Sequence, residues 1–143
     1  MNYINYFFSF TFLVIILSSC VSNKKITQAN HPQLLDEHTF LISKTTTDKT
    51  YGFTPKNPVK VGGYSPKNER RFLNALAGPK GEVLYYKRAG SCCPFSTPNG
   101  LLGQGRLDRY LVTWQGGKDT LSLYINMYDY ETLKVPVGLR TKQ

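Results

Sequence analysis

The sequence predicts an α+β fold, with one helix packed on a mostly antiparallel sheet of roughly four to six strands. Three observations lead to this prediction. Several short segments alternate apolar and polar side chains, as strands do, and one other segment has the spacing of a helix. Glycine or proline separates these segments along the chain.

Two strands are expected before the helix. Residues 39–46 include three threonines and Ile42, and both residue types are typical of strands. Residues 56–63 follow, with Val59 and Val61 expected on one face. Because proline cannot donate a hydrogen bond to a neighbouring strand, Pro58 limits this second segment to a short strand at a sheet edge.

Ser65 and Pro66 open the predicted helix. A serine hydroxyl can accept a hydrogen bond from an amide of the first turn, and proline lacks the amide that would otherwise be unpaired there. An apolar stripe follows, made of Phe72, Leu73, Ala75 and Leu76. Gly78 and Pro79 are expected to end the helix.

The remaining strands are expected after this point. Residues 82–88 alternate as a strand does, and the glycine- and proline-rich residues 89–105 are predicted to form a loop. Residues 107–115 and 120–127 flank Gly116 and Gly117, which predicts a β-hairpin.

The last strand candidate is residues 132–139. Pro136 interrupts it, so it is expected at a sheet edge.

The N-terminus has the pattern of an export signal. Its clean apolar run, residues 6–17, is about a dozen residues long, whereas a membrane-spanning helix needs about 20. The run ends in Leu17-Ser18-Ser19-Cys20, which resembles the lipobox of bacterial lipoproteins. That resemblance implies cleavage before Cys20 and attachment of acyl chains to Cys20. An uncleaved anchor helix is the alternative.

The predicted organisation therefore has three parts: a signal peptide (1–19), a lipidated N-terminus with a flexible linker (20–38) and a single α+β domain (39–143). Removal of 19 residues from the 143 leaves 124, a length that suits one domain with one core. Several acyl chains hold a protein at a membrane far more firmly than one chain does.

The charge balance is basic, with a formal net charge of +9. An exported chain does not normally meet nucleic acid, so acidic partners of the cell envelope are expected instead. The expected partners are an envelope protein or an anionic glycan or lipid. The membrane is a further partner, which the protein contacts through the lipid on Cys20. The candidate anion contacts are Arg70, Arg71, Lys87 and Arg88. A merely solvated basic surface is the alternative.

Cys92 and Cys93 are the candidate reactive residues. They could form a disulfide with each other, remain thiols, or place one sulfur in the core. Lys87 and Arg88 would favour the thiolate if their charged groups point toward the cysteines. The pair lacks the Cys-X-X-Cys spacing of thiol oxidoreductases.

No metal site and no cofactor are predicted. His31 and His38 stand seven residues apart without a cysteine cluster beside them. Both precede the predicted domain, so a Ser-His or Cys-His catalytic pair inside it requires that the linker fold back.

Aromatic residues are frequent near the C-terminal strands. They could line a surface that binds a glycan or a peptide, or they could simply cover the faces of a sheet. These residues are Tyr110, Trp114, Tyr124, Tyr128 and Tyr130.

Four segments carry a family resemblance: KNPVKVGG (56–63), NERRFLNALAGPKGE (68–82), GSCCPF (90–95) and LYINMYDYETLKVPVG (123–138). Together they resemble a family of small, uncharacterised bacterial envelope lipoproteins. Some members carry the name 2-dehydro-3-deoxyphosphooctonate aldolase. True enzymes of that kind use a TIM barrel, which typically has about 250 residues. The resemblance supplies no catalytic residues.

The sequence thus predicts a lipid-anchored lipoprotein of the cell envelope, in the periplasm or at the outer membrane, that acts as a binding or structural module. A thiol-dependent enzyme that uses Cys92 and Cys93 is the alternative, and the aldolase activity is the last choice.

Overall fold

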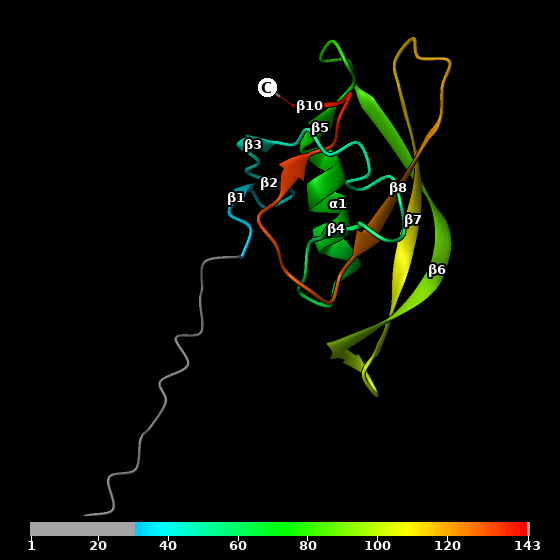
Figure 1. Cartoon of the computed structure of the whole chain (residues 1–143). Helices are drawn as coiled ribbons and strands as arrows, with labels where there is room; N and C mark the ends of the chain where they lie inside the picture. Colours follow the sequence, from blue (N-terminus) through cyan, green and yellow to red (C-terminus); the bar gives the residue numbers. More distant parts are fainter. Residues whose placement is uncertain (1–30, 143) are drawn as a thin grey trace, which may run out of the picture.

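The computed structural model describes residues 31–142. The predicted signal peptide, Cys20 and most of the predicted linker lie outside this range. The described residues form one helix and ten strands (Figure 1). In chain order these are β1 (Leu34–Asp36), β2 (Thr39–Phe40), β3 (Lys44–Thr45), β4 (Val59–Lys60), α1 (Pro66–Asn74), β5 (Leu76–Ala77), β6 (Leu84–Leu101), β7 (Gln104–Trp114), β8 (Leu121–Asn126), β9 (Lys134–Val135) and β10 (Arg140–Thr141).

The strands of the described residues form four sheets. The main sheet has the order β4-β8-β7-β6, in which β6, β7 and β8 are antiparallel and β4 is parallel to β8. Three two-stranded sheets pair β1 with β2, β5 with β10, and β3 with β9, the last in parallel.

The fold is therefore α+β, as predicted, but the single, mostly antiparallel sheet of four to six strands is wrong. Both parallel pairs join segments that are far apart in the chain. The alternation of side chains within a segment indicates a strand, but it does not indicate which distant segment will be the partner.

Helix α1 and the small sheets lie on one side of the main sheet (Figure 1). Phe72 and Leu73 of α1 are buried there with Val112, Leu123 and Ile125 of the sheet. Val59 and Val61 are buried in the same core, and β4 is an edge strand, as predicted for residues 56–63. The hairpin predicted around Gly116 and Gly117 corresponds to β7 and β8.

The helix begins as predicted and ends earlier. Pro66 is its first residue, and the Ser65 hydroxyl accepts a hydrogen bond from the Lys67 amide at 3.2 Å. The helix ends at Asn74 with Ala75 as its C-cap, so Gly78 and Pro79 do not end it. The helix ends early because the next residues, Leu76 and Ala77 of β5, are extended and pair with β10.

Residues 89–105 do not form the predicted loop. Most of them belong to β6, which runs on from Leu84 to Leu101 opposite β7. Register shifts between Arg88 and Gly90 and between Cys92 and Pro94 each leave one residue of β6 unpaired, so the pairing with β7 continues past them. Because β6 is an edge strand, Pro94 is accommodated there.

Two other predicted strands are shorter than expected. Residues 39–46 are divided between β2 and β3, which belong to different sheets. Within residues 132–139 only β9 is a strand, and Pro136 follows directly after it.

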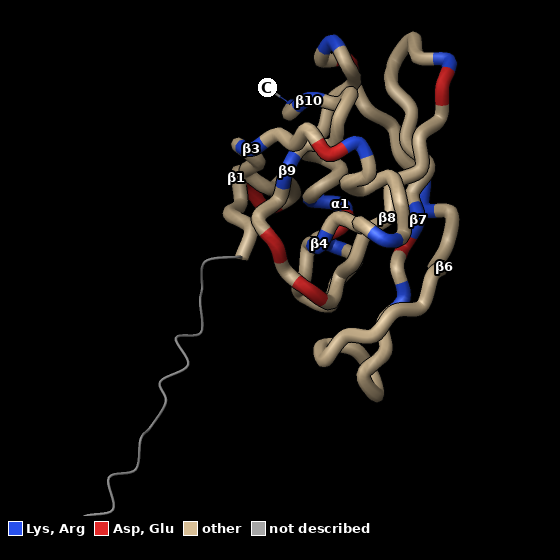
Figure 2. The backbone as a smooth tube through the Cα atoms, viewed as in Figure 1, with Lys and Arg blue, Asp and Glu red and all other residues tan. Residues whose placement is uncertain are grey.

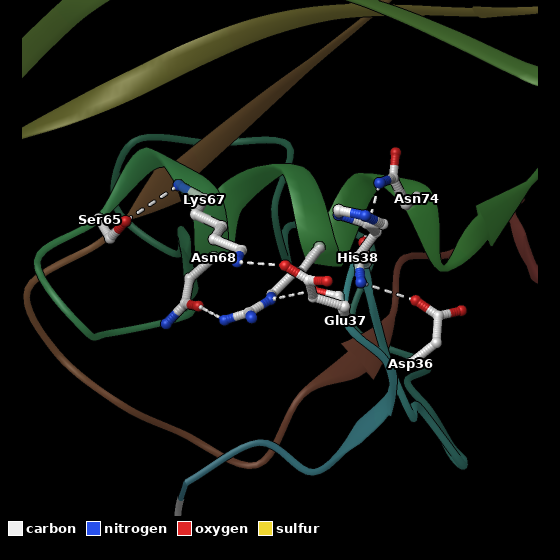
Figure 3. Close-up of polar contacts among 8 residues, drawn as sticks. Asp36, Glu37, His38, Ser65, Lys67, Asn68 and Asn74 are labelled. Atoms are coloured by element: carbon white, nitrogen blue, oxygen red, sulfur yellow. Dashed lines mark hydrogen bonds and ion pairs between the residues drawn. The ribbon is translucent and has the colours of Figure 1, made fainter.

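The last residues of the predicted linker belong to the fold. Residues 37 and 38 lie along α1, and Figure 3 shows polar side chains of the helix reaching them. Arg71 Nε donates to the Glu37 carbonyl oxygen at 2.9 Å, and Asn74 Nδ2 donates to the His38 carbonyl oxygen at 2.9 Å. Strand β1 is also part of the folded structure, which therefore begins before Thr39.

Among residues 31–142, no helix is both long enough and apolar enough to cross a membrane.

Removal of the Phe72 ring tests this packing. Phe72 is fully buried between α1 and the sheet, so Phe72→Ala should lower the free energy of unfolding by about 3–5 kcal/mol. Urea unfolding measures the change. Arg70→Ala, at an exposed position of the same helix, is the control and should change it by less than about 0.5 kcal/mol. Similar values for the two variants would contradict the packing described.

Candidate functional site

One face of the main sheet is turned away from the helix, and no described helix or strand lies over it (Figure 1). Lys87 pairs with Leu111, and Arg109 pairs with Tyr124, across neighbouring strands. Because side chains alternate along a strand, these four residues and Tyr85 share this side, which we call the outer face. Tyr85 is 54% exposed.

The alternate residues of the same strands point toward the helix. Tyr110 and Val112 of β7 are buried in the core. Tyr86 of β6 packs edge-on against Tyr110, with ring centroids 6.1 Å apart. The main sheet therefore has one closed face and one open face, as is common for antiparallel strands.

A hollow of about 290 Å³ lies where β6 bends on the outer face. It is lined by Ala89, Gly90, Ser91, Cys92, Cys93, Arg109 and Tyr124. Gly90 and Cys93 both have positive φ, at 126° and 54°, and they lie at two of the three register shifts between β6 and β7. The bent strand thus sets the cysteines beside Arg109 and Tyr124.

Cys92 and Cys93 are joined to each other by a disulfide. This is the first of the three states that the sequence allowed. Neither sulfur is a free nucleophile in this state, so a thiol reaction at this position requires prior reduction.

Beneath the hollow, Asp108 is buried and holds two residues of β6. Its carboxylate accepts hydrogen bonds from Arg88 Nε at 2.6 Å, from Arg88 Nη2 at 2.8 Å and from Ser91 Oγ at 2.7 Å. Burial acts to raise the pKa of Asp108, but the hydrogen bonds from Arg88 and Ser91 hold that pKa below its usual value. Arg88, whose side chain is half exposed, is therefore committed to an ion pair with the buried Asp108.

A second buried carboxyl lies between α1 and β7. Glu69 is 0% exposed, and its Oε2 accepts a hydrogen bond from the Tyr110 hydroxyl at 2.8 Å. Its Oε1 has no hydrogen-bond partner. Burial raises the pKa of Glu69 to about 7, and the negative charge of Asp108 adds to the increase. Glu69 consequently changes its protonation state near neutral pH.

The four candidate anion contacts occupy different places. Lys87 is on the outer face and Arg88 is paired with Asp108. Arg70 is exposed on α1. Arg71 is engaged, because it donates to Asn68 Oδ1 at 2.9 Å as well as to the Glu37 carbonyl oxygen. The structure does not bring the four together.

Arg109 was missed as a candidate, although it lies beside the disulfide on the outer face. The signal was present in the predicted strand 107–115, where the alternation of side chains places Arg109 on the same side as Leu111.

The aromatic residues proposed from the sequence do not form one surface. Tyr110 is buried in the core, whereas Tyr124 lines the hollow.

A slightly larger hollow, of about 320 Å³, lies near the C-terminus. Lys80, Arg140 and Lys142 are part of its lining, which also includes the Glu82 carboxylate. Hydrogen bonds from backbone amides of Lys80 and Glu82, and the nearby charges of Lys80 and Arg140, lower the pKa of Glu82. A carboxylate of the chain itself therefore already offsets part of this positive charge, which makes the hollow a weaker anion site.

Metal-ligand side chains are not clustered in the part of the chain that the structure describes. No group of three or more His, Cys, Asp and Glu residues within 31–142 could hold a metal ion. His31 instead packs against Tyr130, with ring centroids 4.1 Å apart. Cys20, the predicted lipidation site, lies outside the described residues.

Comparisons with known proteins return nothing for this chain: no protein-family model, no curated protein and no solved structure matches it.

The raised pKa of Glu69 predicts a pH-dependent stability. The folded state holds the proton up to about pH 7, whereas the unfolded chain releases it near 4.5. Stability should therefore fall as the pH rises between these values and level off above them. Glu69→Gln removes this contribution, so at pH 8 the variant should be more stable than the wild type by up to about 3 kcal/mol.

Urea unfolding at several pH values measures this difference between variant and wild type. Asp119→Asn, which removes an exposed carboxylate from the turn between β7 and β8, is the control and should follow the wild-type profile. Parallel profiles for Glu69→Gln and wild type would show that Glu69 does not bind the proton as described.

Proposed function

We propose that this protein is a lipid-anchored lipoprotein of the cell envelope whose domain binds an acidic glycan on its outer face. The anchor is Cys20, as the N-terminal apolar run and the lipobox resemblance imply. The observation that carries the binding proposal is the uncovered face of the main sheet, where cationic and tyrosine side chains lie together.

The charge of the outer face favours an acidic ligand. The outward positions of β6, β7 and β8 include Lys87 and Arg109 and no aspartate or glutamate. Asp108 points to the opposite side, where Arg88 neutralises it. An arginine guanidinium can bind a carboxylate through two parallel hydrogen bonds, so Arg109 is the expected main contact.

The tyrosines favour a glycan among the acidic ligands. Tyr85 and Tyr124 present aromatic rings at the same face as the cations. A tyrosine combines an apolar ring with a polar hydroxyl, and sugar rings likewise have apolar faces with polar edges. The hollow beside Tyr124, of about 290 Å³, is close to the lower end of the size range of small-ligand sites.

The binding proposal can be tested with a galacturonic acid oligosaccharide as the probe and its neutral methyl ester as the matched ligand. Isothermal titration calorimetry should detect the acid and not the ester. Arg109→Ala should weaken binding about tenfold or more, because a charged hydrogen bond contributes roughly 1.5–3 kcal/mol. Equal binding of acid and ester would contradict the proposal.

The matched control is Lys118→Ala. Lys118 is an exposed cation of the turn that follows β7, so its loss changes the net charge by the same amount as the loss of Arg109. If Lys118→Ala weakens binding as much as Arg109→Ala does, the effect is one of overall charge and not of the outer face.

A thiol-dependent enzyme is the second candidate, and the observation that favours it is the position of Cys92 and Cys93 in the same hollow as Arg109. Reduction of the disulfide would give thiols close to a cation, which lowers thiol pKa values. We do not propose the aldolase activity. Residues 31–142 form four separate sheets, whereas a TIM barrel is one closed sheet and typically needs about 250 residues.

Replacement of both cysteines separates the two candidates. The Cys92→Ser and Cys93→Ser double variant should keep its affinity for the acidic probe within about threefold, because neither sulfur carries a charge that the ligand needs. Calorimetry measures the affinity, and circular dichroism checks the fold. Complete loss of binding in a folded double variant would favour the thiol-dependent role.

A further inference from the structure

The tip of the β6–β7 hairpin carries two exposed leucines. Leu101 is 79% exposed and Leu102 is 94% exposed, the highest values for large apolar side chains among residues 31–142. Leu102 also has a positive φ of 53°, which a leucine rarely adopts. Exposure and backbone conformation both disfavour leucine at this position, which points to a role outside the stability of the fold.

The hairpin tip is held firmly in place. The Thr97 amide donates to the Gly103 carbonyl oxygen at 3.0 Å, which closes the loop. At the base of the loop, Asp129 Oδ1 accepts hydrogen bonds from Thr97 Oγ1 at 2.6 Å and from Asn99 Nδ2 at 2.8 Å. The leucines are thus presented by an ordered turn, so a ligand that covers them does not have to order the loop first.

Aromatic side chains stand behind the tip. Phe95 of β6 packs edge-on against Tyr128, with ring centroids 5.9 Å apart. Tyr128 in turn contacts Tyr64, with ring centroids 4.8 Å apart, and Tyr64 is 55% exposed. Apolar tips backed by tyrosines are typical of protein surfaces that meet the boundary between lipid and water.

The hairpin itself carries a positive charge near its tip, whereas the Asp129 carboxylate contacts the loop from outside the hairpin. Arg106 is the only charged residue between positions 89 and 107. It is exposed and lies opposite Pro94 in the hairpin, and Figure 2 shows no charged residue at the tip itself. A cation behind an apolar tip suits the anionic headgroups of a membrane surface.

The described chain begins beside the base of the same hairpin. The His31 ring packs against Tyr130, which directly follows Asp129, the residue that holds the loop. Residues 21–30 can span at most about 36 Å when fully extended. An anchor at Cys20 therefore limits the distance of this end of the domain from the membrane to about that length.

We propose that Leu101 and Leu102 insert into the surface of the membrane to which Cys20 is anchored, with Arg106 at the headgroups. This inference depends on the lipid anchor of the proposed function, but not on glycan binding. Insertion fixes the orientation of the domain, because the tether and the hairpin tip then form two separate points of attachment. The β6–β7 hairpin extends beyond the rest of the fold, which places its tip first against a surface (Figure 1).

A tryptophan introduced at the tip tests the insertion. The acylated protein is reconstituted into vesicles that contain an anionic phospholipid and a lipid with a spin label near the headgroup, which quenches tryptophan fluorescence on contact. The Leu102→Trp variant should lose about twice as much fluorescence as the control or more, because surface-bound apolar groups lie within roughly 5–10 Å of the headgroup boundary.

The control is Val83→Trp, at an exposed position just before the other end of β6. Both variants keep Trp114, whose signal is measured in the wild type and subtracted. Equal quenching of the two variants would overturn the proposal. Absence of quenching at position 102 would also overturn it and would leave the leucines to a protein partner.

The same samples distinguish a failed insertion from a failed anchor. The intact mass of the reconstituted protein reports whether Cys20 is acylated. An acylated protein without quenching at position 102 overturns the insertion alone and leaves the proposed function intact. A protein that is purified without acyl chains overturns the anchor and, with it, this inference.

Discussion

The arrangement of the molecule depends on one contact, the hydrogen bond of 2.8 Å between the Tyr110 hydroxyl and Glu69 Oε2. It joins α1 to the middle of the main sheet in a place that water does not reach. An unpaired polar group in such a place is costly, so this bond and the apolar contacts of Phe72 fix the helix against one face of the sheet. The opposite face is consequently left open, and everything proposed about ligand binding follows from that asymmetry.

The two faces of β6 and β7 have different chemistry because successive side chains of a strand point in opposite directions. On the closed side, Arg88 and Asp108 neutralise each other. On the open side, Arg109 and Lys87 have no carboxylate among their neighbours in the sheet. Adjacent residues of one strand, Asp108 and Arg109, therefore serve different purposes: one holds the bent strand in place and the other is available to a ligand.

The sequence predicts well those features that depend on local chemistry. The Ser65 cap, the burial of Val59 and Val61, and the hairpin around Gly116 and Gly117 all follow from neighbouring residues. Features that depend on the pairing of strands were missed. Strand β6 runs through the cysteines because β7 pairs with it, although its register shifts and Pro94 suggest a loop when the sequence is read alone.

The candidate site was predicted only in part for the same reason. Cys92, Cys93 and Lys87 were identified from their residue types, but Arg109 joins them only through strand register. Backbone carbonyls of residues 37 and 38 bind α1, and a carbonyl has no signal in the sequence. The most direct test of the central claim is an NMR titration of backbone amides with the galacturonic acid oligosaccharide. The account predicts shifts at Lys87, Arg109, Leu111 and Tyr124, whereas shifts confined to α1 or to the C-terminal hollow would contradict it.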